Sequence, residues 1–507
     1  MFYCNIVPLF MYKKDKIFDY LKYSFIVIFS CFLNLNTNAQ NQFGLTSGNY
    51  SGLHNLLINP ANICFQPVTY ELNIVGADVF INNNNFFTNA TFVPKLGFNN
   101  NFNRFRFKNR NFKPDSLKPG NLLLFSNIKP NGYVFGGVNV LGPSILFALS
   151  RKKSMAITTG LRTHVSATNI ESIGAIAFFE GLSYDPIKFQ QMKLKNTKIS
   201  LASWSEIGLS YAQVISDKRN YTQRLGISVK ALFGTMGGYA YDKGFNGRNE
   251  NGSQLIFENS SFSYAYSGPT TSDRLSNTNS NSFALRGIGA SFDLGYSIQK
   301  NIVPGTRYCP NLYQYGNNTK AYNWRAGISF LDIGAIQYFK NSFATNIVNG
   351  SLVWEKFDTI VAYDISTIDA TLRKYVGEEH TQTFKKFWLI LPSAVSLQYD
   401  YNINSVFYID ATIIQRITLA RMPSLSRMNS IAIIPRYETE NLSICLPFIL
   451  NEYKDINIGL AVRYKYFTVG SDRFGETFGL QNIYGANLYL AIKYNIINKR
   501  RIWKKLF

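Results

Sequence analysis

A long alternation of apolar and polar side chains, repeated along the chain, is the feature that most constrains its fold. Between residues 456 and 466, every even-numbered side chain is large and apolar, whereas the odd-numbered ones are Asn, Gly, Ala, Arg and Lys. The same period of two occurs over residues 206–211, 224–231 and 287–298. Because successive side chains of a β-strand point to opposite faces, each segment predicts a strand with one apolar and one polar face.

Strand length and composition favour a transmembrane β-barrel over a soluble β-sandwich, in which strands also alternate. Many runs reach about ten residues, which is the length that crosses a bilayer at a tilt. Their polar face mixes Gly and Ser with charged residues, as expected where side chains meet a wet lumen. Tyr484 and Tyr494 flank an apolar face at positions typical of aromatic girdles. The sequence therefore predicts an all-β fold, a transmembrane antiparallel β-barrel.

The N-terminus has the pattern of a secretory signal peptide. Four Lys residues between positions 13 and 22 precede an apolar core over residues 24–33, and Ala39 ends a cleavage site of small residues. We expect residues 1–39 to be removed, with Met1 or Met11 as the true start. A lipoprotein anchored through Cys31 is the lesser alternative.

The rest of the chain divides into three predicted parts: an N-terminal luminal segment (40–69), an outer-membrane barrel (70–497) and a basic C-terminal tail (498–507). Within the first part, SGLHNLLINPANICF (51–65) is apolar but does not alternate. Asn59 is a good helix cap and Pro60 suits the first helical position, so this step predicts a turn or a helix start. The tail is either solvated or in contact with an anionic inner leaflet.

The net charge of +22 restricts the class of partner. In an exported protein, nucleic acid is not expected, even though residues 102–112 interleave basic and aromatic side chains. Lipopolysaccharide phosphates and other outer-membrane lipids are the expected anionic partners. Cys64, Cys309 and Cys445, the three Cys residues beyond the signal peptide, give neither a disulfide framework nor a metal-ligand spacing.

Catalytic patterns are scarce, and we predict neither a metal nor a cofactor. The chain has three His residues and no HExxH, Cys-x-x-Cys or phosphate-binding loop. His164 and Ser166 would share one strand face, and Asn169 follows closely; outer-membrane phospholipases use such a set on a barrel wall. A barrel-wall lipid hydrolase is therefore the third functional alternative, and the prediction is that the protein is not an enzyme.

Both ends of the mature chain resemble an uncharacterised outer-membrane barrel family of Bacteroidetes. The similar segments are SGNYSGLHNLLINPANI, IIPRYETENLSICLPFIL and INIGLAVRYKYFTVGSD. The motif positions are Asn59, Pro60, Ala61, Asn62, Pro435, Arg436, Tyr437, Glu438, Gly470, Ser471 and Asp472. More distantly, the chain resembles the long-chain fatty-acid transporter class, including barrel components of type IX secretion. That resemblance implies about 14 strands and places the Asn-Pro-Ala step in a plug inside the barrel.

These observations predict an outer-membrane barrel that transports or binds hydrophobic or amphipathic molecules. The alternative is a structural component of a secretion or surface-attachment complex, with proteins of that complex as partners. The lining of the lumen separates the two hypotheses. A continuous apolar surface favours transport, whereas a solid polar filling favours a scaffold.

Overall fold

The fold is taken from a computed structural model of the 507-residue chain. The predicted signal peptide, the predicted basic tail and Cys309 lie outside the described residues. The residues that the structure describes are 42–65, 70–87, 104–107, 121–126, 131–150, 152–180, 184–194, 196–252, 254–269, 284–302, 322–354, 365–418 and 422–496.

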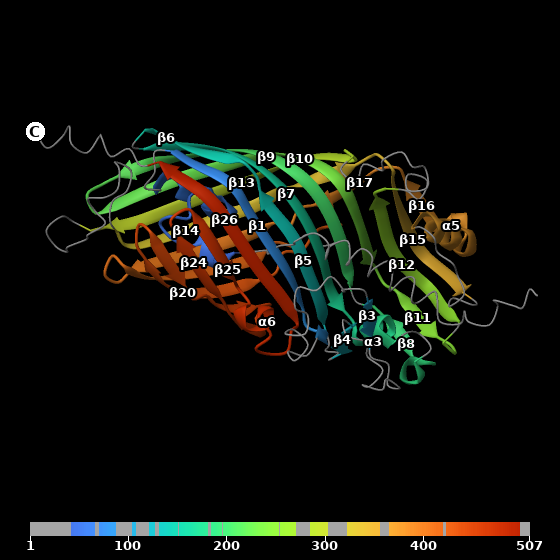
Figure 1. Cartoon of the computed structure of the whole chain (residues 1–507). Helices are drawn as coiled ribbons and strands as arrows, with labels where there is room; N and C mark the ends of the chain where they lie inside the picture. Colours follow the sequence, from blue (N-terminus) through green and yellow to red (C-terminus); the bar gives the residue numbers. More distant parts are fainter. Residues whose placement is uncertain are drawn as a thin grey trace, which may run out of the picture.

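The described strands form a closed antiparallel barrel of 14 strands, as predicted (Figure 1). The first strand, β1, pairs with the last, β26, so the main sheet has no open side. The barrel strands are β1 (Tyr70–Asn83), β5 (Gly132–Leu141) with β6 (Ser144–Ser150), β7 (Lys153–Ile170), β9 (Lys198–Asp217), β10 (Tyr221–Asp242), β12 (Leu255–Ser267) with β13 (Gly287–Asn301), β14 (Tyr322–Tyr338) with β15 (Ser342–Trp354), β16 (Thr381–Phe384) with β17 (Phe387–Ile390) and β18 (Ala394–Asn402), β19 (Phe407–Arg416), β20 (Ser430–Glu438), β21 (Leu442–Cys445) with β22 (Phe448–Asn451), β23 (Asp455–Ile458) with β24 (Leu460–Tyr464), β25 (Phe467–Ser471) and β26 (Gly485–Ile496).

Several barrel strands consist of two or three pieces because the sequence interrupts their hydrogen bonding. β5 and β6 both pair with β1 and with β7 in one continuous direction, and Gly142 and Pro143 separate them. Pro392 similarly lies between β17 and β18, and Pro447 between β21 and β22. Proline has no backbone N–H to donate, so it breaks a ladder locally without ending the strand.

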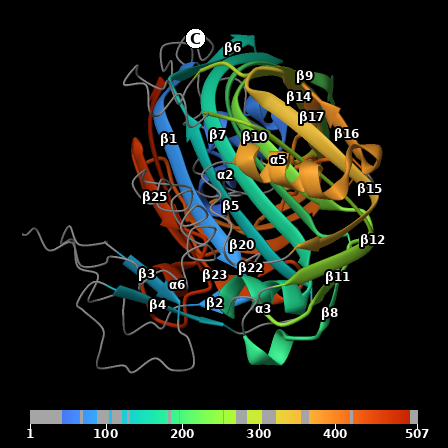
Figure 2. The same ribbon diagram turned by 90° about the vertical axis from the view of Figure 1, so that its right-hand side faces the viewer.

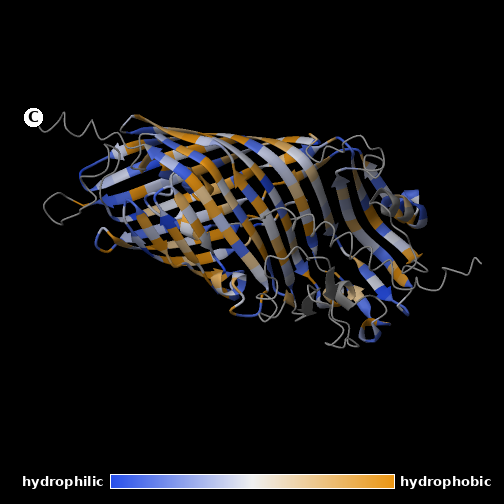
Figure 3. Cartoon of the chain, in the orientation of Figure 1, coloured by the Kyte–Doolittle hydropathy of each residue, from blue (hydrophilic) through white to orange (hydrophobic). Residues whose placement is uncertain are grey.

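The outer surface of the barrel is apolar, as the alternation predicts. On β23 and β24, Ile456 and Ile458 are 76% and 51% exposed, whereas Asn457 and Arg463, which alternate with them, are 2% and 7% exposed. Figure 3 shows apolar residues alternating with polar ones along the strands. An apolar exterior around a sheet with every edge paired satisfies the requirements of a bilayer.

No helix in the described ranges is long and apolar enough to cross a membrane.

The two ends of the barrel differ. At the end where β1 begins and β26 finishes, five strand connections have only two to four residues; we call it the short-turn end. The opposite, long-loop end carries the extra elements (Figure 1). They include α3 (Ser172–Glu180), η6 (Asp185–Ile187), β8 (Gln191–Lys193), β11 (Asn246–Asn249), α5 (Ile365–Val376), η9 (Glu378–His380) and α6 (Phe474–Thr477), and a small sheet of β2 (Phe86–Phe87), β3 (Arg104–Phe107) and β4 (Asn121–Ser126) follows β1.

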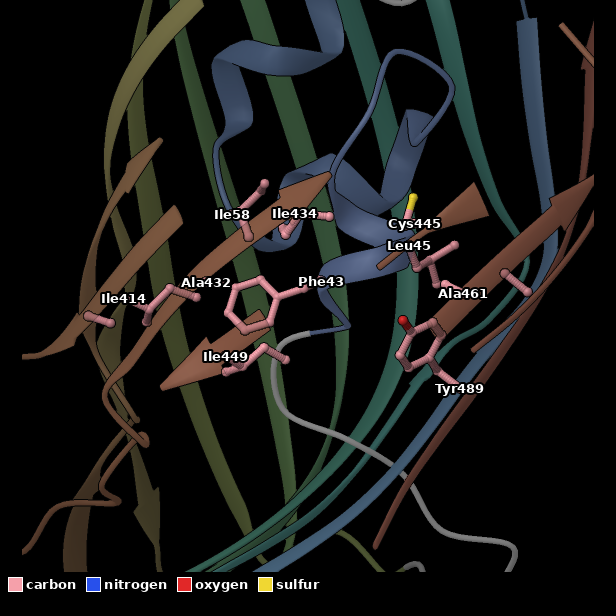
Figure 4. Close-up of a cluster of buried hydrophobic side chains, with 12 residues drawn as sticks. Phe43, Leu45, Ile58, Ile414, Ala432, Ile434, Cys445, Ile449, Ala461 and Tyr489 are labelled. Atoms are coloured by element: carbon pink, nitrogen blue, oxygen red, sulfur yellow. The ribbon is translucent and has the colours of Figure 1, made fainter. Parts of the chain in front are cut away.

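Two segments enter the lumen. The plug segment, residues 42–65, contains α2 (Phe43–Thr46), η1 (Gly52–Leu57) and η2 (Pro60–Phe65), and the barrel strands surround it (Figure 2). The strap, residues 423–429, connects β19 to β20, and residues 424–429 are buried. In Figure 4, Phe43, Leu45 and Ile58 of the plug segment pack among inward-facing residues of the last strands. The lumen is therefore filled by backbone as well as by side chains.

Candidate functional site: a lumen filled by two inserted segments

Carboxylates of the C-terminal strands hold the beginning of the plug segment. Glu438 accepts hydrogen bonds from the backbone N and the Nδ2 of Asn49, at 2.9 and 3.2 Å. Asp472 accepts one from the backbone N of Phe43 at 3.0 Å. Both carboxylates are buried and belong to the motifs singled out in the sequence. The structure thus brings the two C-terminal motifs to the same inserted segment.

A buried ion pair holds the middle of the plug segment. Glu71 accepts a hydrogen bond from the backbone N of Leu53 at 2.7 Å and lies 3.7 Å from Lys493 Nζ. Lys493 Nζ also donates to the carbonyl of Tyr50. Gly52 has a φ of +59°, and a β-carbon there would lie 1.8 Å from Glu71 Oε2, so this close approach requires glycine. Because Glu71 lies on β1 and Lys493 on β26, the pair ties the plug segment to the closing seam of the barrel.

The Asn-Pro-Ala step fits into a recess formed by glycine residues of the wall. A β-carbon on Gly226 of β10 would lie 2.4 Å from the backbone N of Ala61, and one on Gly295 of β13 would lie 2.8 Å from Pro60 Cδ. Asn59 Nδ2 donates to the Tyr296 carbonyl at 3.1 Å and to Gln398 Oε1 at 2.9 Å.

Asn59 also accepts, through Oδ1, the backbone N–H of Ala61 at 3.0 Å, where η2 begins. The helix start at this step and its contacts with the barrel strands therefore coexist. Asn62 is buried one residue further along, and its Nδ2 lies 3.5 Å from Asn55 Oδ1.

The remaining motif residues build the wall. Arg436 is buried between Asp400 and Glu438, at 2.8 and 3.0 Å. Pro435 accepts a hydrogen bond from the backbone N of Leu446, and the Tyr437 ring packs 5.2 Å from that of Phe407. A β-carbon on Gly470 would meet the Tyr489 ring at 2.5 Å, and Ser471 Oγ lies 3.1 Å from Thr477 Oγ1.

A layer of charged side chains projects into the lumen beyond the plug segment. Asp332 of β14 lies 2.8 Å from Arg162 Nη1 of β7 and 2.9 Å from Lys230 Nζ of β10. Lys230 also pairs with Asp293 at 2.8 Å, and Arg427 of the strap lies 3.7 Å from Asp332. We call these five residues the ionic layer. Paired charges from β7, β10, β13 and β14 and from the strap thus narrow the lumen at this level.

The strap crosses the lumen above this layer and hydrogen-bonds to several strands. Its first residues pair with β17: the Ile390 backbone N donates to the Pro423 carbonyl at 3.1 Å, and the Leu425 N donates to the Ile390 carbonyl at 2.9 Å. Ser200 Oγ of β9 donates to the Ser424 carbonyl at 3.0 Å. At its other end, the Asn429 backbone N donates to Glu452 Oε1 at 2.7 Å.

Apolar side chains line the barrel on either side of the strap. We call the larger set the apolar wall; Leu425 of the strap packs against it. Its residues lie on β9, β10, β12, β14, β15 and β17, and one directly follows β17. They are Ala202, Trp204, Leu232, Ala265, Ile336, Tyr338, Ala344, Phe387, Leu389 and Leu391, and all are buried. On the other side, Met428 of the strap packs with Phe80, Tyr133 and Phe135. At the level of the strap the lumen is therefore lined by apolar side chains, whereas the plug segment makes both polar and apolar contacts with the wall.

The residues of the possible hydrolase site have other partners. His164 and Ser166 of β7 are both buried and face inward. However, Ser166 Oγ accepts the backbone N–H of Ser426 at 3.0 Å, and Asn169 Nδ2 donates to the Asn196 carbonyl at 3.2 Å. Asn169 therefore does not orient the imidazole of His164 in this arrangement. In the ranges that the structure covers, no group of three or more His, Cys, Asp or Glu side chains could hold a metal ion.

Sequence reasoning missed several residues of this site. Glu71, Lys493, Asp332 and Gln398 contact the inserted segments or form the ionic layer, yet none lies in a motif. For Glu71, Lys493 and Gln398 a signal was available, because each occupies the polar face of an alternating strand. Asp332 gave none, because a bulge in β14, where its φ is +51°, turns it inward against the alternation. The strap gave no comparable signal, since residues 423–429 show neither a repeat nor a strand pattern.

Comparison with solved structures gives similarities to outer-membrane channels. The TodX monoaromatic hydrocarbon channel with the deltaS2S3 mutation is 8% identical, with 89% of this chain and 95% of that chain covered and a TM-score of 0.40. The toluene transporter TbuX of Ralstonia pickettii is 10% identical (92% and 100% covered; TM-score 0.37). A FadL homologue of Pseudomonas aeruginosa is 10% identical (91% and 99% covered; TM-score 0.37). Similarities this distant do not define a function.

No curated protein matches the chain. A protein family, however, matches it over residues 60–472, from the second residue of the Asn-Pro-Ala step to the last residue of the Gly-Ser-Asp motif. The chain therefore belongs to the family of unknown function DUF5723.

Proposed function

We propose that this protein is an outer-membrane barrel that passes or binds hydrophobic or amphipathic molecules. The predicted signal peptide would export it, and its apolar exterior suits insertion into the outer membrane. In such barrels the short turns face the periplasm and the longer loops face outward. The long-loop end would therefore be the entrance, and outer-membrane lipids and lipopolysaccharide would surround the wall.

The apolar wall is the observation that carries this proposal. In a barrel that only spans the membrane, inward-facing residues are expected to be polar. Here Trp204, Leu232 and Leu389 face inward on neighbouring parts of the wall and are at most 1% exposed. A large apolar ligand could replace their contacts with the strap, and burial of its surface would supply the binding free energy.

The plug segment and the ionic layer would then make passage selective. A molecule leaving the apolar wall meets the charges around Asp332 and the plug segment below them. An open aqueous channel has no such obstruction. Passage therefore requires the strap, and then the ionic layer or the plug segment, to move.

Two tryptophans on the long-loop half offer a matched test of ligand binding. Trp204 faces inward and is fully buried, whereas Trp388 of β17 faces outward and is 56% exposed. We expect Trp204→Ala to lower the affinity for an apolar aromatic probe about tenfold, because a buried aromatic contributes about 1.5–3 kcal/mol. Trp388→Ala should leave that affinity unchanged. The measurement is probe binding to purified protein in non-ionic detergent, with the heat-modifiable gel shift as a test of folding; equal effects of both substitutions would contradict the proposal.

A structural role in a secretion or surface-attachment complex is the second candidate. The polar filling between Glu71, Glu438 and Asp332 favours it, since a scaffold needs no path through its lumen. Crosslinking in intact cells followed by mass spectrometry separates the candidates. Stoichiometric recovery of the same protein partners, with no probe binding, would favour the scaffold. We propose no enzymatic role, because Ser166 and Asn169 have the other partners described above.

A further inference from the structure

Arg224, on the inward face of β10, is a buried cation that has no hydrogen-bond or ion-pair partner within the described ranges. The residue is 2% exposed, and its Nε and Nη1 atoms are enclosed without a hydrogen bond. Other buried guanidinium groups have oxygen partners: Arg325 and Arg436 both lie 2.8 Å from Asp400, and Arg463 donates to backbone carbonyls. Because an enclosed charge without hydrogen bonds is costly, Arg224 has a strong tendency to bind an anion.

A second guanidinium lies beside the same aromatic ring. The Cζ atoms of Arg325 and Arg224 lie 3.7 and 5.8 Å from the ring centroid of Phe65, the last residue of η2. Arg325 is 7% exposed, so the pair is shielded from solvent. A guanidinium over a ring keeps the N–H groups at its own edge available for an oxygen ligand. The two cations and the end of the plug segment thus form one local cluster.

Two carboxylates lie near this cluster. Asp400 is bound by Arg325, Arg436 and the hydroxyl of Tyr322. Asp217, at the exposed end of β9, attracts Arg224 electrostatically, and its carboxylate accepts a hydrogen bond from Thr222 at 3.1 Å. Arg224 is therefore the cation of this cluster whose enclosed Nε and Nη1 atoms lack an oxygen partner among the described residues.

We infer that Arg224 and Arg325 form an oxyanion site at the short-turn end of the lumen, which takes a carboxylate or a phosphate group and fastens the end of the plug segment to the barrel. The planar guanidinium fork matches both kinds of group. The bound group neutralises Arg224, and the contacts of both guanidinium groups with the Phe65 ring then hold the end of the plug segment, next to Cys64. This site does not depend on what crosses the barrel, because it lies on the opposite side of the ionic layer from the apolar wall.

Cys64 provides a local readout of this site. Its thiol is buried, with Sγ donating to the Lys152 carbonyl at 3.4 Å, so alkylation requires the end of the plug segment to loosen. The experiment uses the full mature protein in non-ionic detergent and adds sodium phosphate, acetate or decanoate against sodium chloride of equal ionic strength. Alkylation rates are measured for each Cys separately by mass spectrometry of its peptide. We expect at least one oxyanion to slow alkylation of Cys64 about tenfold without changing that of Cys445 in the wall.

Substitutions distinguish a ligand site from a merely structural arginine. Arg224→Gln should abolish the protection, whereas Arg248→Gln, which removes an exposed charge at the long-loop end, should preserve it. If Arg224→Gln does not fold, Arg224→Lys, which keeps the charge but loses the fork, should weaken the protection. Protection by phosphate identifies a free phosphate site, and protection by decanoate alone identifies an amphipathic carboxylate. The inference is overturned if none of the three anions protects Cys64 in the unmodified protein, or if Arg224→Gln keeps the protection.

Discussion

The plug segment and the strap both fill the lumen, but the wall holds them in different ways. The plug segment is held by carboxylates at Glu438, Asp472 and Glu71, and by the close fit of Gly226 and Gly295 against Pro60 and Ala61. The strap is held mainly by backbone hydrogen bonds and hydroxyl groups; its charged contacts are the Glu452 carboxylate, which accepts the Asn429 N–H at one end, and one long ion pair from Arg427. Hydrogen bonds to charged groups are stronger than those between neutral groups. The difference indicates that the plug segment is a fixed part of the barrel and that the strap is the more easily displaced.

The largest expected effect comes from breaking the ion pair at the barrel seam. Glu71→Met leaves Lys493 buried without a carboxylate and the Leu53 N–H without an acceptor, so we expect a loss of about 3–5 kcal/mol in the free energy of unfolding. The double variant Glu71→Met/Lys493→Met should be less destabilised than Glu71→Met alone. Denaturant unfolding in detergent, followed by the gel shift, measures both. A double variant with the summed loss of the two single variants would show that the charges do not act as a pair.

The next effect concerns the recess for the Asn-Pro-Ala step. Gly226→Val would place a side chain against the backbone of Pro60 and Ala61, and overpacking of this kind costs about 1–3 kcal/mol. We expect the substitution to loosen the plug segment, seen as faster alkylation of Cys64. Gly136→Ala is the control, because a β-carbon there meets only the Phe80 carbonyl at 3.7 Å. An unchanged Cys64 rate in Gly226→Val would mean that the plug segment does not depend on this recess.

A smaller effect is expected at the strap. Ser166→Ala removes the acceptor of the Ser426 N–H and Ser200→Ala removes the donor to the Ser424 carbonyl, each at about 0.5–1.5 kcal/mol. Each substitution should favour the displaced strap, with the barrel still closed. Hydrogen exchange of residues 422–430, with the plug segment as internal reference, measures this. Faster exchange in both segments would indicate general destabilisation in place of a local movement.

The smallest effect is expected from a wall residue that holds neither segment. Tyr437 packs outward against Phe407, so Tyr437→Phe should change the unfolding free energy by less than about 0.5 kcal/mol. Its neighbour Arg436 bridges Asp400 and Glu438, and Arg436→Met should cost several kcal/mol. Comparable losses of unfolding free energy in the two variants would mean that the ion pairs of Arg436 contribute no more to stability than the outward-facing Tyr437.

The sequence predicted the wall better than the filling of the lumen. Alternation at positions 456–466 identified the outward side of β23 and β24, because lipid imposes one chemical requirement on every outward residue. The luminal position of Asn59 came from a family resemblance, and its partners Tyr296 and Gln398 could not be assigned without the pairing of the strands. The strap was not predicted, because its burial depends on partners such as Ser166 and Ile390, which are remote in sequence. Contacts across a lumen do not produce a periodic pattern in the sequence on either side of the contact.

The relative mobility of the two segments tests the account most directly. Ser426 of the strap is buried, as is Cys64 of the plug segment, so a Ser426→Cys variant carries one buried thiol in each segment. Alkylation in native membranes can be followed at both positions by peptide mass spectrometry. The account predicts that the thiol introduced into the strap reacts at least about ten times faster than Cys64, because the strap opens at a lower free energy than the plug segment. Equal rates, or faster reaction at Cys64, would contradict it.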